Sequence, residues 1–356
     1  MHAHCVQESF MTSTAGSQLS SSELSLPLPE SRELWLAPSA LHWKQIFLQL
    51  QSRGQCLPPS VIDCIAAPGK IRVLPEVCDR DFATLAQLYA IASLVCVFKH
   101  TQSLFATEDS NLHRVTLIAD ESQQRRLVQI IQALDIGNSD YECPGTAAWS
   151  LLGEFASMHL HTSFDQLEVL AGREGPDEAR QVYPRLRLWF QSESSRRAVW
   201  HAGQVLRHMR VLHPSTLHIF HALACYHASL CLCIYGLLTN LGGSRAASPV
   251  PSLTEKASFL LEGEETLATR RWILLGVGNP MIATSASNLD MPPQSDDRTA
   301  LNSVSKMMSV TIAIVRHKFQ ERSKTMPLLV DNICRLMQSI GKLDQAGPFD
   351  PRVVLN

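Results

Sequence analysis

The feature that most constrains the fold is a long segment without charge. Residues 211–244 contain no Asp, Glu, Lys or Arg, yet the central part, LHIFHALACYHASLCLCIYGLL, holds three histidines and three cysteines. Three structures are consistent with such a segment: a membrane span, a metal site, or the central helix of a large helical core. Choosing among them decides the class of protein.

A metal site is the first alternative. On a helix, His218, His221 and Cys225 are spaced at i, i+3 and i+7 and therefore share one face, with ligand types that suit zinc. A fourth ligand would have to come from another part of the chain, and no distant Cys/His pair has ligand spacing. Ordinary buried histidines bonded to backbone or water explain the pattern more simply, so we expect no metal.

A membrane span is the second alternative, because about 20 apolar residues suffice to cross a bilayer. Three histidines, Tyr226 and Tyr235 lie in the middle of the segment. The arginines that flank it give no clear charge asymmetry, and the neighbouring predicted helices are amphipathic. The segment is therefore predicted to be the buried central helix of the protein, over about residues 214–238.

Helical spacing of apolar residues recurs along most of the chain, which predicts an all-α protein. We expect a flexible arm at 1–30, one large helical domain at 31–345 with roughly ten helices, and a C-terminal tail at 346–356. One segment, HRVTLIA at 113–119, could be a strand. Asp120 is predicted to cap a helix that Gly137 ends. The other predicted helices lie at about 38–53, 85–98, 145–161, 176–191, 194–212, 299–320 and 327–341.

Composition narrows the function classes. The formal net charge of −2 argues against a dedicated nucleic-acid-binding chain. The chain has ten cysteines and no recognisable signal peptide, so it is expected to be intracellular. The cysteines are then expected to be reduced and mostly buried in the protein.

Two glycine-containing stretches imitate known motifs. LLGVGNP at 274–280 has Gly276 and Gly278 in G-x-G, but Met281 occupies the third glycine position and the preceding residues look helical rather than strand-like. These glycines are expected to end a helix. Residues 242–246, GGSRA, imitate a nucleophile elbow but lie in a Ser/Pro-rich loop rather than a strand-to-helix turn.

Clusters of charged residues are the remaining candidates for a functional site. Asp296 and Asp297 lie in a Pro/Ser loop without the second carboxylate cluster that a metal-dependent helical enzyme would need, and LEGEET at 261–266 is interpreted as a solvated helix boundary. The helix at 194–210 is predicted to pack in the core and to turn a basic face to solvent, with little capacity for phosphate. That face comprises Arg196, Arg197, Arg207 and Arg210.

Three phrases together carry a family resemblance: SESSRRAVWHAGQVLRHMR, HIFHALACYHASLCLCIYG and LLEGEETLATRRWILLGVGNP. They resemble the regulatory domain of fungal-specific transcription factors, the middle homology region. ELSLPLPESRELWLAPSALHWK at 23–44 is similar to the segment that leads into that domain. The likeness is more specific at 194–280 than elsewhere in 23–341.

The resemblance implies an all-α regulatory domain of a nuclear protein that regulates transcription by RNA polymerase II through protein partners. Relatives often carry a zinc module, either a six-cysteine cluster or paired C2H2 fingers. Here Cys5, Cys56, Cys64 and Cys78 form no C-x2-C pair. The chain is therefore expected to be part of a longer protein or to regulate without contacting DNA itself.

The expected function is thus non-enzymatic, with no catalytic, cofactor-binding or metal-ligating residue and little or no DNA binding by this chain alone. A small-molecule effector and a homodimer stay open. The alternatives from other classes are an α-helical metabolic enzyme and a membrane-associated protein that uses residues 211–244.

Overall fold

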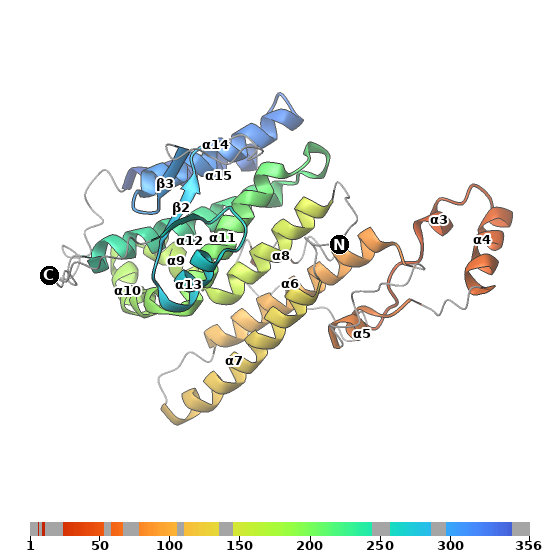
Figure 1. The fold of residues 1–356 in the computed structure, drawn as a ribbon, viewed down its shortest axis with the longest axis horizontal. Coiled ribbons are helices and arrows are strands. Elements are labelled where there is room, and N and C mark those ends of the chain that lie inside the picture. The colour runs from red at the N-terminus through yellow and green to blue at the C-terminus, as the bar shows by residue number, and fades with distance from the viewer. Residues whose placement is uncertain are drawn as a thin grey trace. The chain divides into compact units, whose positions relative to one another are not determined.

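The structure is a computed structural model that describes residues 6, 9–10, 24–52, 58–66, 78–104, 110–134, 145–243, 257–285 and 297–343. Helices dominate these ranges, and the strands form one small sheet, which confirms the all-α prediction. Figure 1 shows the order of the elements along the chain. The contacts within the chain divide it into two compact units, residues 1–149 and 150–356, where the sequence predicts one domain over 31–345.

The helices of the first unit include α3 (Arg32–Trp35), α4 (Ala40–Ser52), α5 (Val61–Ala66), α6 (Arg80–Leu104) and α7 (Ser110–Ala133). Isolated antiparallel bridges pair Pro27 with Ser60 and Glu30 with Cys78. These bridges bring the end of the predicted N-terminal arm against α5 and the start of α6. Most of that arm, and the whole predicted tail at 346–356, lie outside the described residues.

The strand predicted at 113–119 is wrong, because these residues belong to α7. Val115, Thr116 and Ile118 favour strands, but such propensities are weak and the helical pattern that follows extends back through them. Consequently Asp120 lies inside α7 instead of capping it. Gly137 lies outside the described residues, and α7 itself ends at Ala133.

The second unit is built around α12. Together with α8, which crosses the boundary between the units, its elements are α8 (Thr146–His161), α9 (Phe164–Leu170), α10 (Pro176–Gln191), α11 (Glu193–Val211), the 3-10 helix η3 (Pro214–Thr216), α12 (Ile219–Gly243), β1 (Ser258–Leu260), α13 (Leu267–Leu275), β2 (Asn279–Ala283), β3 (Arg298–Ala300), α14 (Val304–Arg322) and α15 (Leu328–Leu343).

Helix α12 contacts α9, α10, α11, α14 and α15, and α14 and α15 lie side by side next to it (Figure 1). Nearly all of its side chains from Phe220 to Leu238 are buried, including Cys225, Cys231 and Cys233. The prediction of a buried central helix is confirmed, but α12 begins at Ile219 rather than near residue 214, where the 3-10 helix η3 lies instead. An uncharged helix is stable here because the neighbouring helices cover most of its surface.

Hydroxyl side chains set several helix starts in this unit. The Ser192 hydroxyl accepts a hydrogen bond from the Ser195 N–H at the start of α11. Thr266 and Thr269 form a reciprocal capping box at the start of α13. The Ser303 hydroxyl accepts from the Lys306 N–H, so α14 begins at Val304 rather than at the predicted residue 299.

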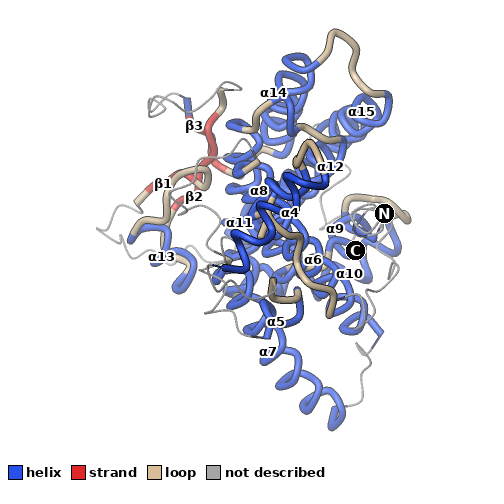
Figure 2. The backbone as a smooth tube through the Cα atoms, turned by 90° about the vertical axis from the view of Figure 1, so that its right-hand side faces the viewer, coloured by secondary structure: helices blue, strands red, loops and turns tan. Residues whose placement is uncertain are grey.

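The three short strands were not predicted from the sequence. β1 pairs in parallel with β2, with Phe259 opposite Pro280, and β2 pairs antiparallel with β3, with Ile282 opposite Thr299. Figure 2 shows the strands gathered together with α13 beside them. Strands of three to five residues are too short for a recognisable two-residue period, so their pairing depends on the surrounding fold.

Candidate functional site

The three residues considered as metal ligands do not form a ligand set. The His218 N–H donates to Nδ1 of His221 at 3.0 Å, and the centroids of the two rings lie 5.9 Å apart. Cys225 is fully buried, and burial raises the pKa of its thiol. Among the described residues, no three His, Cys, Asp or Glu side chains are grouped so that they could hold a metal ion.

The prediction that α11 turns a basic face to solvent is wrong for Arg196 and Arg210, which are buried. Arg210 is completely buried, and its Nε lies 2.7 Å from Oε1 of Glu262, which is also buried. The Arg210 guanidinium also donates to the carbonyls of Ala283, at 3.0 Å, and Ser285. Glu262 belongs to the stretch interpreted as a solvated boundary, and its Oε2 accepts the Ala283 N–H at 2.6 Å. Arg210 and Glu262 thus fasten β2 to α11.

The environment of Glu262 contains opposing electrostatic effects. Burial raises the pKa of this carboxyl group, while the Arg210 guanidinium and the Ala283 N–H oppose that rise by stabilising the carboxylate. Either side chain without the other would leave an uncompensated group in the core.

Arg196 is the second buried arginine of α11. Its Nε donates to the Ile273 carbonyl at 2.7 Å and its Nη2 to the Leu274 carbonyl at 3.4 Å. Both carbonyls belong to the last turn of α13. Carbonyls at this position have no hydrogen-bond partner inside the helix, and they bear the partial negative charge of the helix dipole. Arg196 therefore fixes the C-terminal end of α13 from the inside.

Gln204 and Gly203 hold the segment that precedes α13. The Gln204 amide donates to the carbonyls of Leu261 and Gly263 at 2.7 and 2.8 Å. A Cβ atom at Gly203 would lie 2.4 Å from Cβ of Leu261, so only glycine permits this approach of α11. The Arg207 guanidinium, half-exposed, adds a bond to the Gly263 carbonyl at 3.1 Å.

Two of the four arginines assigned to the basic face of α11 are therefore engaged inside the protein rather than exposed to solvent. Arg196 and Arg210 use their donors on backbone carbonyls and on Glu262, while Arg197 pairs with Glu193 at 2.7 Å. Arg196, Arg207 and Arg210 join the segment from β1 to β2 to α11.

The glycine motifs have structural roles where they are described. Gly276 ends α13 in the left-handed conformation, with φ of 72° and its N–H bonded to the Trp272 carbonyl, as expected. The strand β2 follows this turn, whereas a dinucleotide loop has the strand before and the helix after it. Gly242 and Gly243 are the last residues of α12, and Ser244–Ala246 lie outside the described residues. Asp296 also lies outside them, and Asp297 is exposed.

A polar seam between α8 and α11 was missed by sequence reasoning. Nδ1 of His201 lies 2.6 Å from Oε2 of Glu154, and Nδ1 of His161 lies 3.2 Å from the Ser194 hydroxyl. The rings of His161 and His201 are nearly parallel, and their centroids lie 5.9 Å apart. The available signal was the seven-residue spacing of Ser194 and His201 on α11 and of Glu154 and His161 on α8.

A second histidine pair lies deeper in the core. Nε2 of His159 and Nδ1 of His227 are 3.1 Å apart, and both rings lie against Phe164 and Phe155. Burial lowers the pKa of His227 to about 3, so this ring is neutral at physiological pH. The hydrogen bond between the two rings is then formed by one N–H donor and one nitrogen acceptor.

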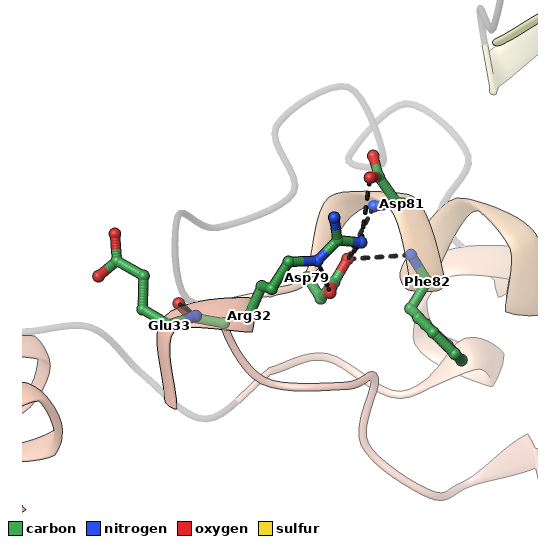
Figure 3. Close-up of polar contacts among 6 residues, drawn as sticks. Arg32, Glu33, Asp79, Asp81 and Phe82 are labelled. Atoms are coloured by element: carbon green, nitrogen blue, oxygen red, sulfur yellow. Dashed lines mark hydrogen bonds and ion pairs between the residues drawn. The ribbon is translucent and has the colours of Figure 1, made fainter. Parts of the chain in front are cut away.

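In the first unit, the best-connected polar group is the start of α6 (Figure 3). Oδ1 of Asp79 accepts the N–H groups of Asp81 and Phe82 at 3.1 Å each, and its Oδ2 binds Nε of Arg32 at 3.0 Å. This arrangement is a helix cap joined to α3 by an ion pair. It explains where α6 begins and presents no reactive group.

The most distinctive surface of the second unit is the outer side of α13. Trp272 and Ile273 point into the core, with Trp272 in edge contact with Tyr235. The opposite side exposes large apolar residues, with exposed fractions of 84% at Leu267 and 70% at Leu275. We call this surface the α13 face, and it comprises Leu267, Arg270, Arg271, Leu274, Leu275 and Val277.

Two described helices, Asp81–Ser103 and Ile219–Leu241, are long and apolar enough to cross a membrane by length and composition. This is weak evidence for a span, because a buried core helix passes the same test. In the second helix, 83% of the most apolar window is buried inside the protein, and in the first 50%.

Comparison of the chain with protein-family models, curated proteins and solved structures gives no significant match.

Proposed function

We propose that this chain is the regulatory and interaction domain of a fungal-type regulator of transcription by RNA polymerase II, working in the nucleus through protein partners. The observation that carries the proposal is the α13 face. It belongs to the last of the three phrases that resemble the middle homology region, and it presents leucines and arginines to solvent on a rigid support.

The three resembling phrases also form one connected body. The first phrase supplies α11, the second α12 and the third the β1–α13–β2 segment. Helix α11 packs on α12 and binds the third phrase through Arg196, Gln204 and Arg210. A family likeness that lies within one packed body supports the proposal more strongly than separate phrases would.

The proposal assigns no catalytic residue and no cofactor. It also expects little DNA binding, because the two buried arginines of α11 are engaged inside the protein and the net charge is −2.

A tethering experiment tests the function. The chain is fused to an unrelated DNA-binding domain and directed to a reporter promoter in fungal cells, with the DNA-binding domain alone as control. We expect the fusion to raise or lower reporter transcription several-fold. Equal reporter transcription with the fusion and with the DNA-binding domain alone, at matched protein abundance, would reject the proposal. Tight sequence-specific DNA binding by the unfused chain in a gel shift would reject the proposed action through protein partners.

A further inference from the structure

We propose that the α13 face binds an acidic, amphipathic helical segment of a protein partner. The inference rests on the proposed function, since it names the partner class of the same site. It combines three properties of α13: the contacts that hold it in place, its exposed leucines, and the positive charge of Arg271, which has no ion pair within the described ranges.

The rigidity of α13 comes from contacts at both ends and underneath. The Thr266–Thr269 capping box fixes the first turn, Arg196 binds carbonyls of the last turn, and Gly276 closes the helix. Trp272 anchors the middle between Tyr235 and Phe259. A surface that is already ordered loses little conformational entropy when a partner binds.

The exposed side chains are spaced for contact with another helix. Leu267, Arg271 and Leu274 lie at i, i+4 and i+7, and Leu275 lies one turn beyond Arg271, so all four share one side. Leu274 is 56% exposed and Val277 40% exposed. A cluster of large apolar side chains in water is unfavourable and marks a surface that another protein covers.

The charge of the face selects the partner. α13 carries Arg270 and Arg271 and no acidic residue. Arg270 has an exposed ion pair with Glu265, which is worth little in water. Arg271 makes no ion pair with any residue of the described ranges, and it lies between the leucines. Carboxylates beside apolar residues in a partner would satisfy both parts of the face.

The acidic residues that precede α13 give the complex a direction. Glu264 and Glu265 lie just before the first turn, so like charges on a partner are repelled there. The partner's carboxylates are therefore expected opposite Arg271 and the second half of α13. A second copy of this chain fits less well, because a two-fold axis at this face would bring the arginines of both copies together.

The binding test uses three labelled peptides of about 14 residues, roughly 20 Å long as helices. One carries leucines at i, i+4, i+7 and i+11 with glutamates between them. The second replaces every glutamate by lysine, and the third keeps the acidic composition but scrambles the leucine spacing. With the full chain, fluorescence anisotropy should detect binding of the first peptide only, weakening as salt increases.

Two substitutions locate the binding. Arg271→Glu and Leu275→Asp should each weaken binding at least about tenfold. The matched controls are Arg187→Glu and Leu188→Asp on α10, where Leu188 is 72% exposed; they should leave affinity unchanged. Thermal unfolding checks that all four variants keep the fold. Equal binding of the lysine peptide, unchanged affinity in both α13 variants, or a dimer that these variants dissociate would overturn the proposal.

The tethering experiment separates this proposal from the proposed function. A fusion that alters transcription while the acidic peptide fails to bind would reject the partner class and leave the regulatory function in place. Specific peptide binding by a transcriptionally silent fusion would do the reverse.

Discussion

Arg210 and Glu262 form an ion pair in which both side chains are completely buried, 52 positions apart in the sequence. Replacing Glu262 by Gln leaves the guanidinium charge in the core without its counter-charge. We expect Glu262→Gln to lower the free energy of unfolding by about 3–5 kcal/mol, measured by urea denaturation.

The matching double variant separates the charge from the packing. Arg210→Met combined with Glu262→Gln removes both charges, so it should be less destabilised than the sum of the two single variants. If the losses simply add, the pair is not energetically coupled and the interpretation is wrong.

Whether Gly203→Ala raises or lowers the stability of the protein tests how closely α11 packs against Leu261. Alanine is favoured over glycine within ordinary helices by up to about 1 kcal/mol. Here the added methyl group would lie 2.4 Å from Cβ of Leu261 and 2.6 Å from its carbonyl oxygen. We expect Gly203→Ala to destabilise the protein by about 1–3 kcal/mol. A gain in melting temperature would show that α11 and Leu261 are not so closely packed.

Two buried histidines make stability depend on pH. Burial lowers the pKa of both His221 and His227 to about 3, whereas unfolded histidine binds protons near pH 6.5. Their contribution is therefore complete above pH 6.5 and is lost as the pH falls from 6.5 toward 3. Each group should add about 1.4 kcal/mol per pH unit to the slope in this range.

Substitution of one histidine isolates that contribution from the titration of carboxylates. Asparagine at position 221 can still accept the His218 N–H but does not titrate. Urea unfolding between pH 6 and pH 4 should show a slope smaller by about 1.4 kcal/mol per pH unit in His221→Asn. An unchanged slope would mean that His221 is protonated in the folded protein.

At the scale of elements, the sequence predicts what depends on neighbours along the chain. The uncharged run from 211 to 244 predicted α12, and apolar spacing predicted α6, α11 and α15. It could not predict that Arg210 is buried, because its counter-charge is Glu262, beyond the whole of α12. The strands could not be predicted for the same reason, since each has only three to five residues and is stabilised by distant partners.

The candidate site divides in the same way. Gly276 was predicted to end a helix because its role is local. The α13 face needs knowledge of which side of α13 is covered, and this depends on Arg196, Gln204 and the core around Trp272. Without those contacts, Leu267 and Leu274 would be assigned to the core.

The order of α13 itself can be tested at Arg196. Arg196→Met keeps an unbranched apolar chain but removes the donors to the Ile273 and Leu274 carbonyls. Hydrogen bonds from charged groups contribute about 1.5–3 kcal/mol, so amide exchange in α13 should become at least about tenfold faster. Amides of α14 serve as the internal control and should not change. Equal protection in both proteins would show that Arg196 does not hold the helix.

For the whole molecule, the division at residues 149 and 150 has a direct consequence. The main helical neighbours of α12, namely α9, α10, α11, α14 and α15, all belong to the second unit. Because α8 begins at Thr146, the fragment must start before that residue to keep the helix intact. We expect residues 145–343, expressed alone, to unfold cooperatively in urea with a helical circular dichroism spectrum.

The same fragment should reproduce the peptide binding of the full chain, because the α13 face and its supports lie entirely within it. Separate expression of residues 1–144 provides the comparison, and it should bind none of the three peptides. The buried Arg210–Glu262 pair requires a closed core around α11 and β2. If fragment 145–343 unfolded without cooperativity, that core would not form in the fragment, and the second unit would depend on the first for its stability.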